Sequence, residues 1–265
     1  MTQTYNRRTV LASLGAVGAL AVGSNALRQR RHPYSYYTYA QSDTEGVRLS
    51  VAWYETYNGE FQEATNGSTE TNATVVTDPT QAPVYIAEAP GPIVTLSNVL
   101  PGDSGTVSIG LLAEQVPPSL EAVDVWFKPT LTSNAENQVT EPEAKDPGED
   151  GTGTSGWDGE LAEALQVQFF ADDGFIGGCD GQFWLTDTPI TPEGSLGSTL
   201  ELVGDGVELT GDRCLAQGER RCFGFTWHLP QEVGNLVQSD SVEFDLAFVA
   251  VECNSGNPFD TEANQ

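Results

Sequence analysis

Hydrophobic and polar residues alternate most regularly near the C-terminus of the chain. Residues 223–229 place an aromatic or aliphatic side chain at every second position, and residues 242–248 repeat the pattern. Beyond Phe248 the second face also becomes apolar, at Val249 and Val251. A period of two predicts β-strands with one buried face. We therefore expect two core strands here, the second covered on both sides at its end.

The segment 230–240 that joins these two strands is too long for a two-residue hairpin. The strands can therefore lie in opposed sheets. Other alternating or apolar segments predict further strands, and two segments predict short helices, at 159–166 and 196–203. The further strands are expected at residues 47–57, 84–87, 93–97, 106–112, 122–128 and 166–171.

Many short strands separated by turn residues are typical of a β-sandwich. The predicted fold class is therefore all-β, a sandwich with short helical insertions and long acidic loops. Its domain is expected to span residues 47–259, followed by a polar tail at 260–265.

The charge is strongly negative, with 38 acidic against 11 basic residues and a net charge of −27. Every acidic residue follows Asn25, whereas five of the basic residues precede Tyr34. Such a surface repels nucleic acid and anionic membranes, so we expect no nucleic-acid partner. Because the acids are spread over the whole chain, adaptation to molar salt explains them better than an ion-binding display surface does.

The acidic segment 133–159 contains almost no apolar residues. A stretch of that composition is not expected to bury a core. We predict a long surface loop between strands.

The N-terminus has the features of an export signal. Residues 1–26 carry Arg7 and Arg8 ahead of an uncharged Ala/Gly-rich stretch, and small residues at 24–26 suit cleavage. A signal anchor is the alternative, because residues 9–27 are about long enough to span a bilayer. A basic cluster at 28–32 leaves the cleavage site open and allows a second processing step after Arg31. Contact with the membrane is expected only in transit, through this leader.

Asn66 and Asn72 each begin an N-x-S/T acceptor motif for glycosylation, and both fall in one polar loop. The motif is short and often arises by chance. Two copies in one loop of an exported chain strengthen the prediction.

Four cysteines in an exported chain most simply form two disulfides, and three pairings are open. Because Cys214 and Cys222 bracket a short loop, we expect them to pair, which leaves Cys179 with Cys253. A metal site is the alternative. The chain has no C-x-x-C motif, and neither of its two histidines has ligand spacing.

One glycine-rich segment, residues 172–181, could bind calcium. It carries Asp172, Asp173 and Asp180 on a turning backbone, which supplies the oxygen ligands that Ca²⁺ prefers. The spacing does not match an EF-hand, and a disulfide-anchored turn is the alternative. Calcium is the one cofactor that the sequence suggests.

Two motifs resemble a known family. One is the turn Leu100–Pro101–Gly102–Asp103–Ser104–Gly105 ahead of an alternating strand, which we interpret as a fixed turn that sets strand register. The other is a C-terminal signature made of Trp227, Leu229–Pro230, Gly234–Asn235, Gln238, Asp240–Ser241–Val242, Phe244–Asp245–Leu246, Phe248, Glu252–Cys253 and Asn257–Pro258–Phe259.

Together these motifs resemble secreted proteins of salt-loving archaea that carry SipW-type signal peptides and are similar to the matrix-fibre protein TasA and to camelysin. The resemblance implies a jelly-roll fold and a place outside the cell or on its surface. It also implies that an N-terminal segment, residues 27–46, donates a strand to the next subunit, with Tyr36, Tyr37 and Tyr39 inside that strand. An ordinary edge strand is the alternative for these tyrosines.

The expected function is that of a secreted structural protein that self-associates into extracellular filaments. A monomeric, wall-associated binding module, in contact with a surface layer, is the alternative. Camelysin is classed as a metallopeptidase, but this chain has no H-E-x-x-H motif, and His228 is the one histidine expected to survive processing. We therefore expect no enzymatic activity.

Overall fold

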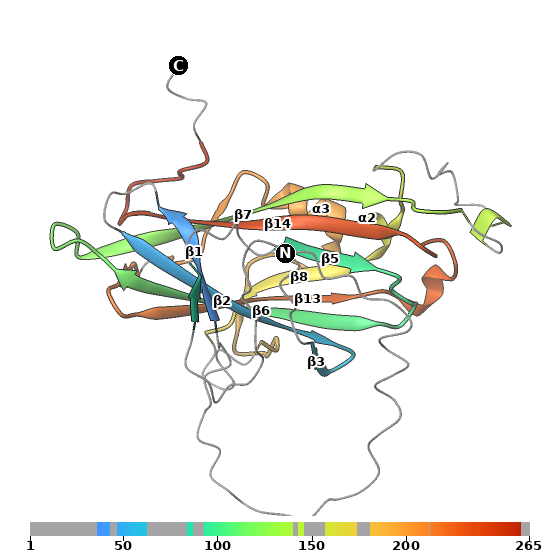
Figure 1. Ribbon diagram of the computed structural model, residues 1–265, viewed down its shortest axis with the longest axis horizontal. Coiled ribbons are helices and arrows are strands. Elements are labelled where there is room, and N and C mark those ends of the chain that lie inside the picture. The colour runs from blue at the N-terminus through green and yellow to red at the C-terminus, as the bar shows by residue number, and fades with distance from the viewer. Residues whose placement is uncertain are drawn as a thin grey trace, which may run out of the picture.

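The computed structural model shows two β-sheets packed face to face (Figure 1). It describes residues 36–42, 47–62, 84–86, 93–139, 143–145, 157–173, 181–211 and 213–260. The predicted all-β sandwich is confirmed. Helices are few and short: η1 (Glu143–Lys145), α2 (Leu161–Ala164), α3 (Leu196–Leu202) and η2 (Gln231–Val233).

The first sheet has the strand order β10-β8-β13-β6-β2-β1, and its long strands are antiparallel. Three short strands extend it: β9 on β8, β3 on β2 and β4 on β1. The strands are β1 (Tyr36–Ser42), β2 (Arg48–Tyr57), β3 (Glu60–Gln62), β4 (Val84–Ile86), β6 (Ser104–Gln115), β8 (Gln166–Ala171), β9 (Thr188–Pro189), β10 (Gly194–Ser195) and β13 (Arg220–His228).

The second sheet is built on the pairing of β14 with β7, which runs the full length of β14 with one irregularity at Glu243/Phe244. The other edge of β14 is shared by β5 along its first half and by β1 near its end. The strands are β5 (Ile93–Ser97), β7 (Ala122–Ala135), β11 (Val207–Glu208), β12 (Leu215–Ala216) and β14 (Ser241–Glu252). β11 and β12 both pair with β7.

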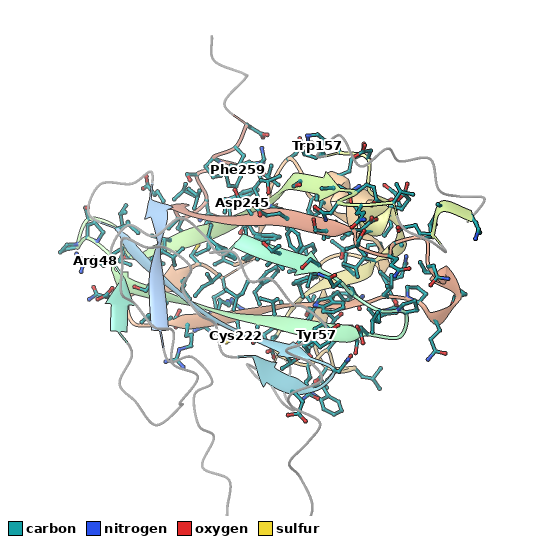
Figure 2. The ribbon with its side chains drawn as sticks, turned by 45° about the vertical axis from the view of Figure 1, so that its right-hand side comes forward. Arg48, Tyr57, Trp157, Cys222, Asp245 and Phe259 are labelled. Carbon is teal, nitrogen blue, oxygen red and sulfur yellow. A yellow bond between two sulfur atoms is a disulfide. The ribbon has the colours of Figure 1, made fainter. Side chains whose placement is uncertain are left out.

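Phenylalanine rings from both sheets form the centre of the core. Phe127 of β7 packs against Phe169 of β8 and Phe223 of β13, with ring centroids 5.3 and 4.7 Å apart. Phe225 meets Phe244 of β14 edge to face at 5.6 Å. Figure 2 shows the side chains that fill the space between the two sheets. Burying each such ring contributes about 2–3 kcal/mol, so this layer dominates the stability of the fold.

The two C-terminal strands match their predicted pattern. In β13, Phe225 is fully buried and His228 is exposed, and in β14 both faces are buried past Phe248. The two strands lie in opposed sheets, as the length of their linker allowed. The strand at 47–57 and both short helices are confirmed as well.

The prediction for residues 133–159 is partly wrong. β7 continues to Ala135, so the segment begins as a strand, and Glu136 and Glu143 are buried, with 2% and 0% of their surface exposed. Acidic side chains are rarely fully buried. Glu136 nevertheless lies buried at the end of the β7–β14 ladder, directly after Ala135, the last paired residue of β7.

Candidate functional site: the seam closed by the first strand

β1 occupies the seam between the two sheets (Figure 1). On one edge, residues 38–40 pair antiparallel with β2, through Thr38 with Val51 and Ala40 with Leu49. On its other edge, β1 pairs in parallel with β4 at its start and with β14 at its end, where Gln41 lies opposite Val249. β1 is therefore hydrogen-bonded along both of its edges.

Without β1, two sheet edges would lose their cover at the same place. One is β2 around Ser50, and the other is β14 around Val249 and Ala250. Unpaired N–H and C=O groups on such edges are a template for an added strand. A peptide that filled the seam would satisfy the groups of both sheets at once, which is the geometry of strand addition.

The segment expected to act as a donor strand does form this strand. Tyr36, Tyr37 and Tyr39 lie in β1. The start of that segment and the leader at 1–26 lie outside the described residues, as do Asn66 and Asn72. Within the described part of the chain, no helix has the length and hydrophobicity needed to span a bilayer.

The turn before β6 is held at the opposite end of the first sheet from the seam pairs. The Asp103 carboxylate accepts hydrogen bonds from Tyr57 Oη, from Asn58 Nδ2 at 2.8 Å and from the Leu100 N–H at 2.8 Å. Burial, followed by the bond to Asp103 and its charge, raises the pKa of Tyr57 far above its usual value. The predicted role of this turn in fixing strand register is consistent with these contacts. They join the β2–β3 turn to the start of β6.

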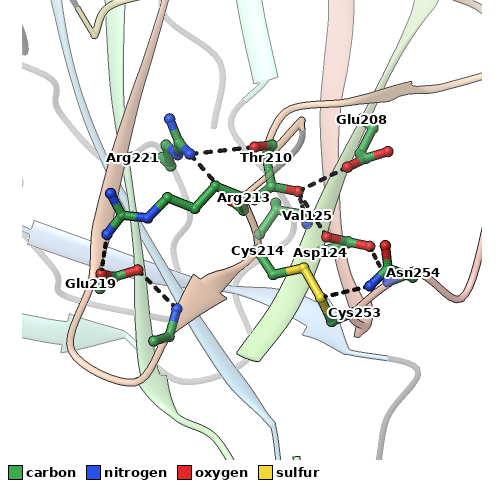
Figure 3. Close-up of a disulfide and its surroundings, with 11 residues drawn as sticks. Asp124, Val125, Glu208, Thr210, Arg213, Cys214, Glu219, Arg221, Cys253 and Asn254 are labelled. Atoms are coloured by element: carbon green, nitrogen blue, oxygen red, sulfur yellow. Dashed lines mark hydrogen bonds and ion pairs between the residues drawn. A yellow bond between two sulfur atoms is a disulfide. The ribbon is translucent and has the colours of Figure 1, made fainter. Parts of the chain in front are cut away.

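A disulfide joins Cys214 to Cys253, with their Cα atoms 5.9 Å apart (Figure 3). The expected pairing of Cys214 with Cys222, and hence of Cys179 with Cys253, is therefore wrong. Cys214 directly precedes β12, which pairs with β7 in the second sheet, whereas Cys222 lies within β13 of the first sheet. The short loop between the two cysteines crosses from one sheet to the other, so nearness in sequence is not nearness in space. Cys222 also belongs to a disulfide, whose other cysteine lies outside the described residues.

Polar contacts surround the Cys214–Cys253 bridge (Figure 3). Buried Asp124 of β7 accepts hydrogen bonds from Thr210 Oγ1 at 3.2 Å and from the N–H of Asn254 at 2.6 Å. Asp124 lies close to both sulfur atoms, but because these are bonded to each other the group cannot ligate a metal through thiolates. The bridge and Asp124 thus fasten the end of β14 to its neighbours.

The predicted calcium loop is described only in part. The carboxylate of Asp172 is buried and accepts a hydrogen bond from the N–H of Gly181 at 2.7 Å. Asp173 lies 3.7 Å from Arg221 Nη1. Asp180 lies outside the described residues, so calcium binding here stays a prediction. Both described aspartates already contact protein groups.

His228 was the one histidine considered for catalysis. Its side chain is 47% exposed, and its Nδ1 lies 3.6 Å from Glu193 Oε1. His228 therefore lies at the surface, next to an acidic side chain.

Sequence reasoning missed one group of buried acids, Glu136, Glu143 and Asp240. One carboxylate oxygen from each lies within 4.8 Å of the others. No local motif marks the group, since Glu136 and Asp240 are far apart in the chain. The available signal was the direct placement of Asp240 before a strongly predicted core strand, where a charged residue is unusual.

The fold, the disulfide and the strand pairings together define the class of protein. It is a disulfide-linked all-β sandwich in which β1 closes a seam between the two sheets. No protein-family model, curated protein or solved structure matches this chain.

Proposed function

We propose that this protein is an exported structural subunit of an extracellular or cell-surface filament, in which β1 of one subunit fills the seam of the next. The observation that carries the proposal is the position of β1, which comes first among the described strands and is paired along both edges. Because β1 precedes the other described strands in the chain, it can leave the seam while those strands stay paired with one another. The disulfides favour an oxidising compartment, which supports export.

Exchange of this strand conserves the hydrogen bonds of the folded subunit. A donated β1 would make the same pairs with β2 and β14 that it makes within its own chain. The contact is head-to-tail, because the donor segment and the acceptor seam are different surfaces. Repetition of such a heterologous contact generates an open filament unless the rotation happens to close a ring.

A cross-linking experiment tests the exchange directly. Thr38 lies opposite Val51 in the β1–β2 register. Two variants, Thr38→Cys and Val51→Cys, would be mixed in molar salt under conditions that form filaments, and then oxidised. We expect disulfide-linked dimers on non-reducing gels, because each chain carries one introduced cysteine, and filaments by negative-stain electron microscopy. Deletion of Tyr36–Ser42 should abolish the filaments.

The matched control pairs Thr38→Cys with Ala52→Cys, which is one residue out of register and should cross-link far less. Equal cross-linking in both mixtures would exclude exchange in this register. Filaments that persist after deletion of β1 would exclude assembly through this strand.

A monomeric secreted module that binds a surface layer is the second candidate. It is favoured by one observation: β1 already satisfies the seam of its own chain. In that case the double variant Thr38→Cys/Val51→Cys would form only an intramolecular bridge. Size-exclusion chromatography in molar salt would then give a single monomer peak at every concentration.

A further inference from the structure

Three acidic residues converge where the longest strand pair of the second sheet ends. The last pair of the β7–β14 ladder is Ala135 with Ser241. Glu136 follows the first of these residues and Asp240 precedes the second, so their backbones lie on opposite sides of the same ladder end. Glu143, in η1, brings a third carboxylate to the same point, and one oxygen from each residue lies within 4.8 Å of the others.

All three side chains are withdrawn from water. Glu136 is 2% exposed, and Glu143 and Asp240 are 0% exposed. Some of their oxygens are used by the protein. Asp240 Oδ2 accepts from the N–H groups of Glu160 and Leu161, at 2.7 and 2.9 Å, and so caps the start of α2.

Two buried oxygens of the cluster accept no hydrogen bond from an N–H or O–H donor among the described residues. They are Glu136 Oε2 and Asp240 Oδ1. The other oxygen of Glu136 accepts a hydrogen bond from the Gln138 N–H at 2.8 Å. Neither Glu136 nor Asp240 has a cationic partner within the part of the chain that the structure describes. Buried carboxylate oxygens are normally hydrogen-bonded or neutralised, so this cluster calls for a positive charge.

We propose that Glu136, Glu143 and Asp240 form a calcium-binding site that fastens the acidic segment after β7 to the end of the sandwich. The donor set is all carboxylate oxygen, which selects a hard cation over zinc or copper. Calcium accepts oxygens at about 2.3–2.6 Å, so oxygens bound to one ion lie at most about 5 Å apart. The three oxygens of this cluster lie within 4.8 Å of one another and meet that limit. The site is distinct from the loop at residues 172–181.

A proton is the competing occupant. Burial, followed by the hydrogen bond to Glu136 and its charge, raises the pKa of Asp240 to about 9. One proton on Asp240 would still leave two buried carboxylates close together. A divalent cation instead neutralises two charges at once and contacts all three side chains, so it fits the cluster better than a single shared proton.

Direct binding is the first test. Calcium would be titrated into the full mature chain by isothermal titration calorimetry at pH 8 in molar KCl, where diffuse binding to surface acids is screened. We expect Asp240→Asn, which retains an oxygen to cap α2, to bind one calcium ion fewer per chain than the wild type. Glu143→Gln is a second test variant should Asp240→Asn fail to fold. The matched control is Glu121→Gln, which removes one exposed carboxylate and should leave the site intact.

Proteolysis gives a readout of the fastening itself. The chain has two lysines, Lys128 within β7 and exposed Lys145 in η1, two residues after Glu143. If the affinity is that of extracellular calcium modules, 10 mM Ca²⁺ should slow cleavage by endoproteinase Lys-C after Lys145 by roughly 10- to 100-fold relative to chelator. Asp240→Asn should lose that protection.

Three results would overturn the proposal. One is equal calcium uptake by folded wild type and folded Asp240→Asn. Another is cleavage after Lys145 that is insensitive to calcium. The third is equal protection by Mg²⁺ at the same concentration, which would reject the assignment to calcium. None of these results depends on whether the protein forms filaments.

Discussion

Removal of the Cys214–Cys253 bridge is expected to lower the free energy of unfolding by a large fraction of its total. The two cysteines are separated by 39 residues. In the chain-entropy model, closing a loop of that length restricts the unfolded chain by about 4 kcal/mol at 25 °C. A domain of this size is stable by roughly 5–15 kcal/mol, and 1 kcal/mol shifts its melting temperature by about 2–4 °C. We therefore expect the Cys214→Ser/Cys253→Ser variant to melt roughly 8–16 °C lower.

The assay is thermal unfolding in molar KCl, followed by circular dichroism, on the two single variants and the double variant. Because each single change breaks the same bridge, all three should lose the same free energy to within about 0.5 kcal/mol. Peptide mapping without reduction should recover Cys214 and Cys253 in one linked species. An additive double variant, or a linked peptide that contains Cys214 and Cys222, would refute the reasoning.

Three further outcomes follow from contacts described for the fold. A methyl group on Gly224 would collide with the ring of Phe170, so Gly224→Ala should lower the free energy of unfolding by about 1–3 kcal/mol. Guanidinium denaturation measures this loss, and an unchanged midpoint would contradict the packing of β13 on β8. Asp103→Ala removes an acceptor shared by three donors and should lower the free energy of unfolding by roughly 1.5–3 kcal/mol in the same assay. Asp103→Asn should lower it by less, and equal losses in the two variants would show that the charge of Asp103 is irrelevant. With calcium removed by a chelator, the pKa of Asp240 is raised to about 9, so the folded chain keeps a proton that the unfolded chain releases near pH 4. This contribution to stability is therefore full below about pH 4 and is lost as the pH rises to about 9. Asp240→Asn should show a smaller fall in melting temperature over that range, and parallel pH profiles of the two proteins would contradict the prediction.

The strands were predictable because apolar residues recur at every second position along the buried face of each strand. Phe225 and Leu246 show this well, since both are fully buried and both alternate with small or polar neighbours. The length of their linker allowed the two strands to lie in opposed sheets but did not require it. The pairing partners did not follow, because local alternation carries no information on which distant strand lies alongside.

The chemistry was harder to predict than the fold. Cys214 was assigned to its nearest neighbour in sequence, and only the crossing of the chain between sheets separates it from Cys222. Glu136 was interpreted as one surface acid among many, because burial at a ladder end depends on Asp240, which is brought there from a distant part of the chain. Both cases depend on contacts between residues that are brought together by the fold, and composition and spacing carry no information on such contacts.

The two strands at the middle of the sheets are also the last two in the described part of the chain. β13 lies between β6 and β8, and β14 lies between β7 and the β5–β1 edge. Neither sheet can therefore be completed until the segments that form β13 and β14 have been synthesised. Pairings between such distant segments form slowly. The newly made chain thus passes through a period in which its unpaired β-strands must be kept from aggregating.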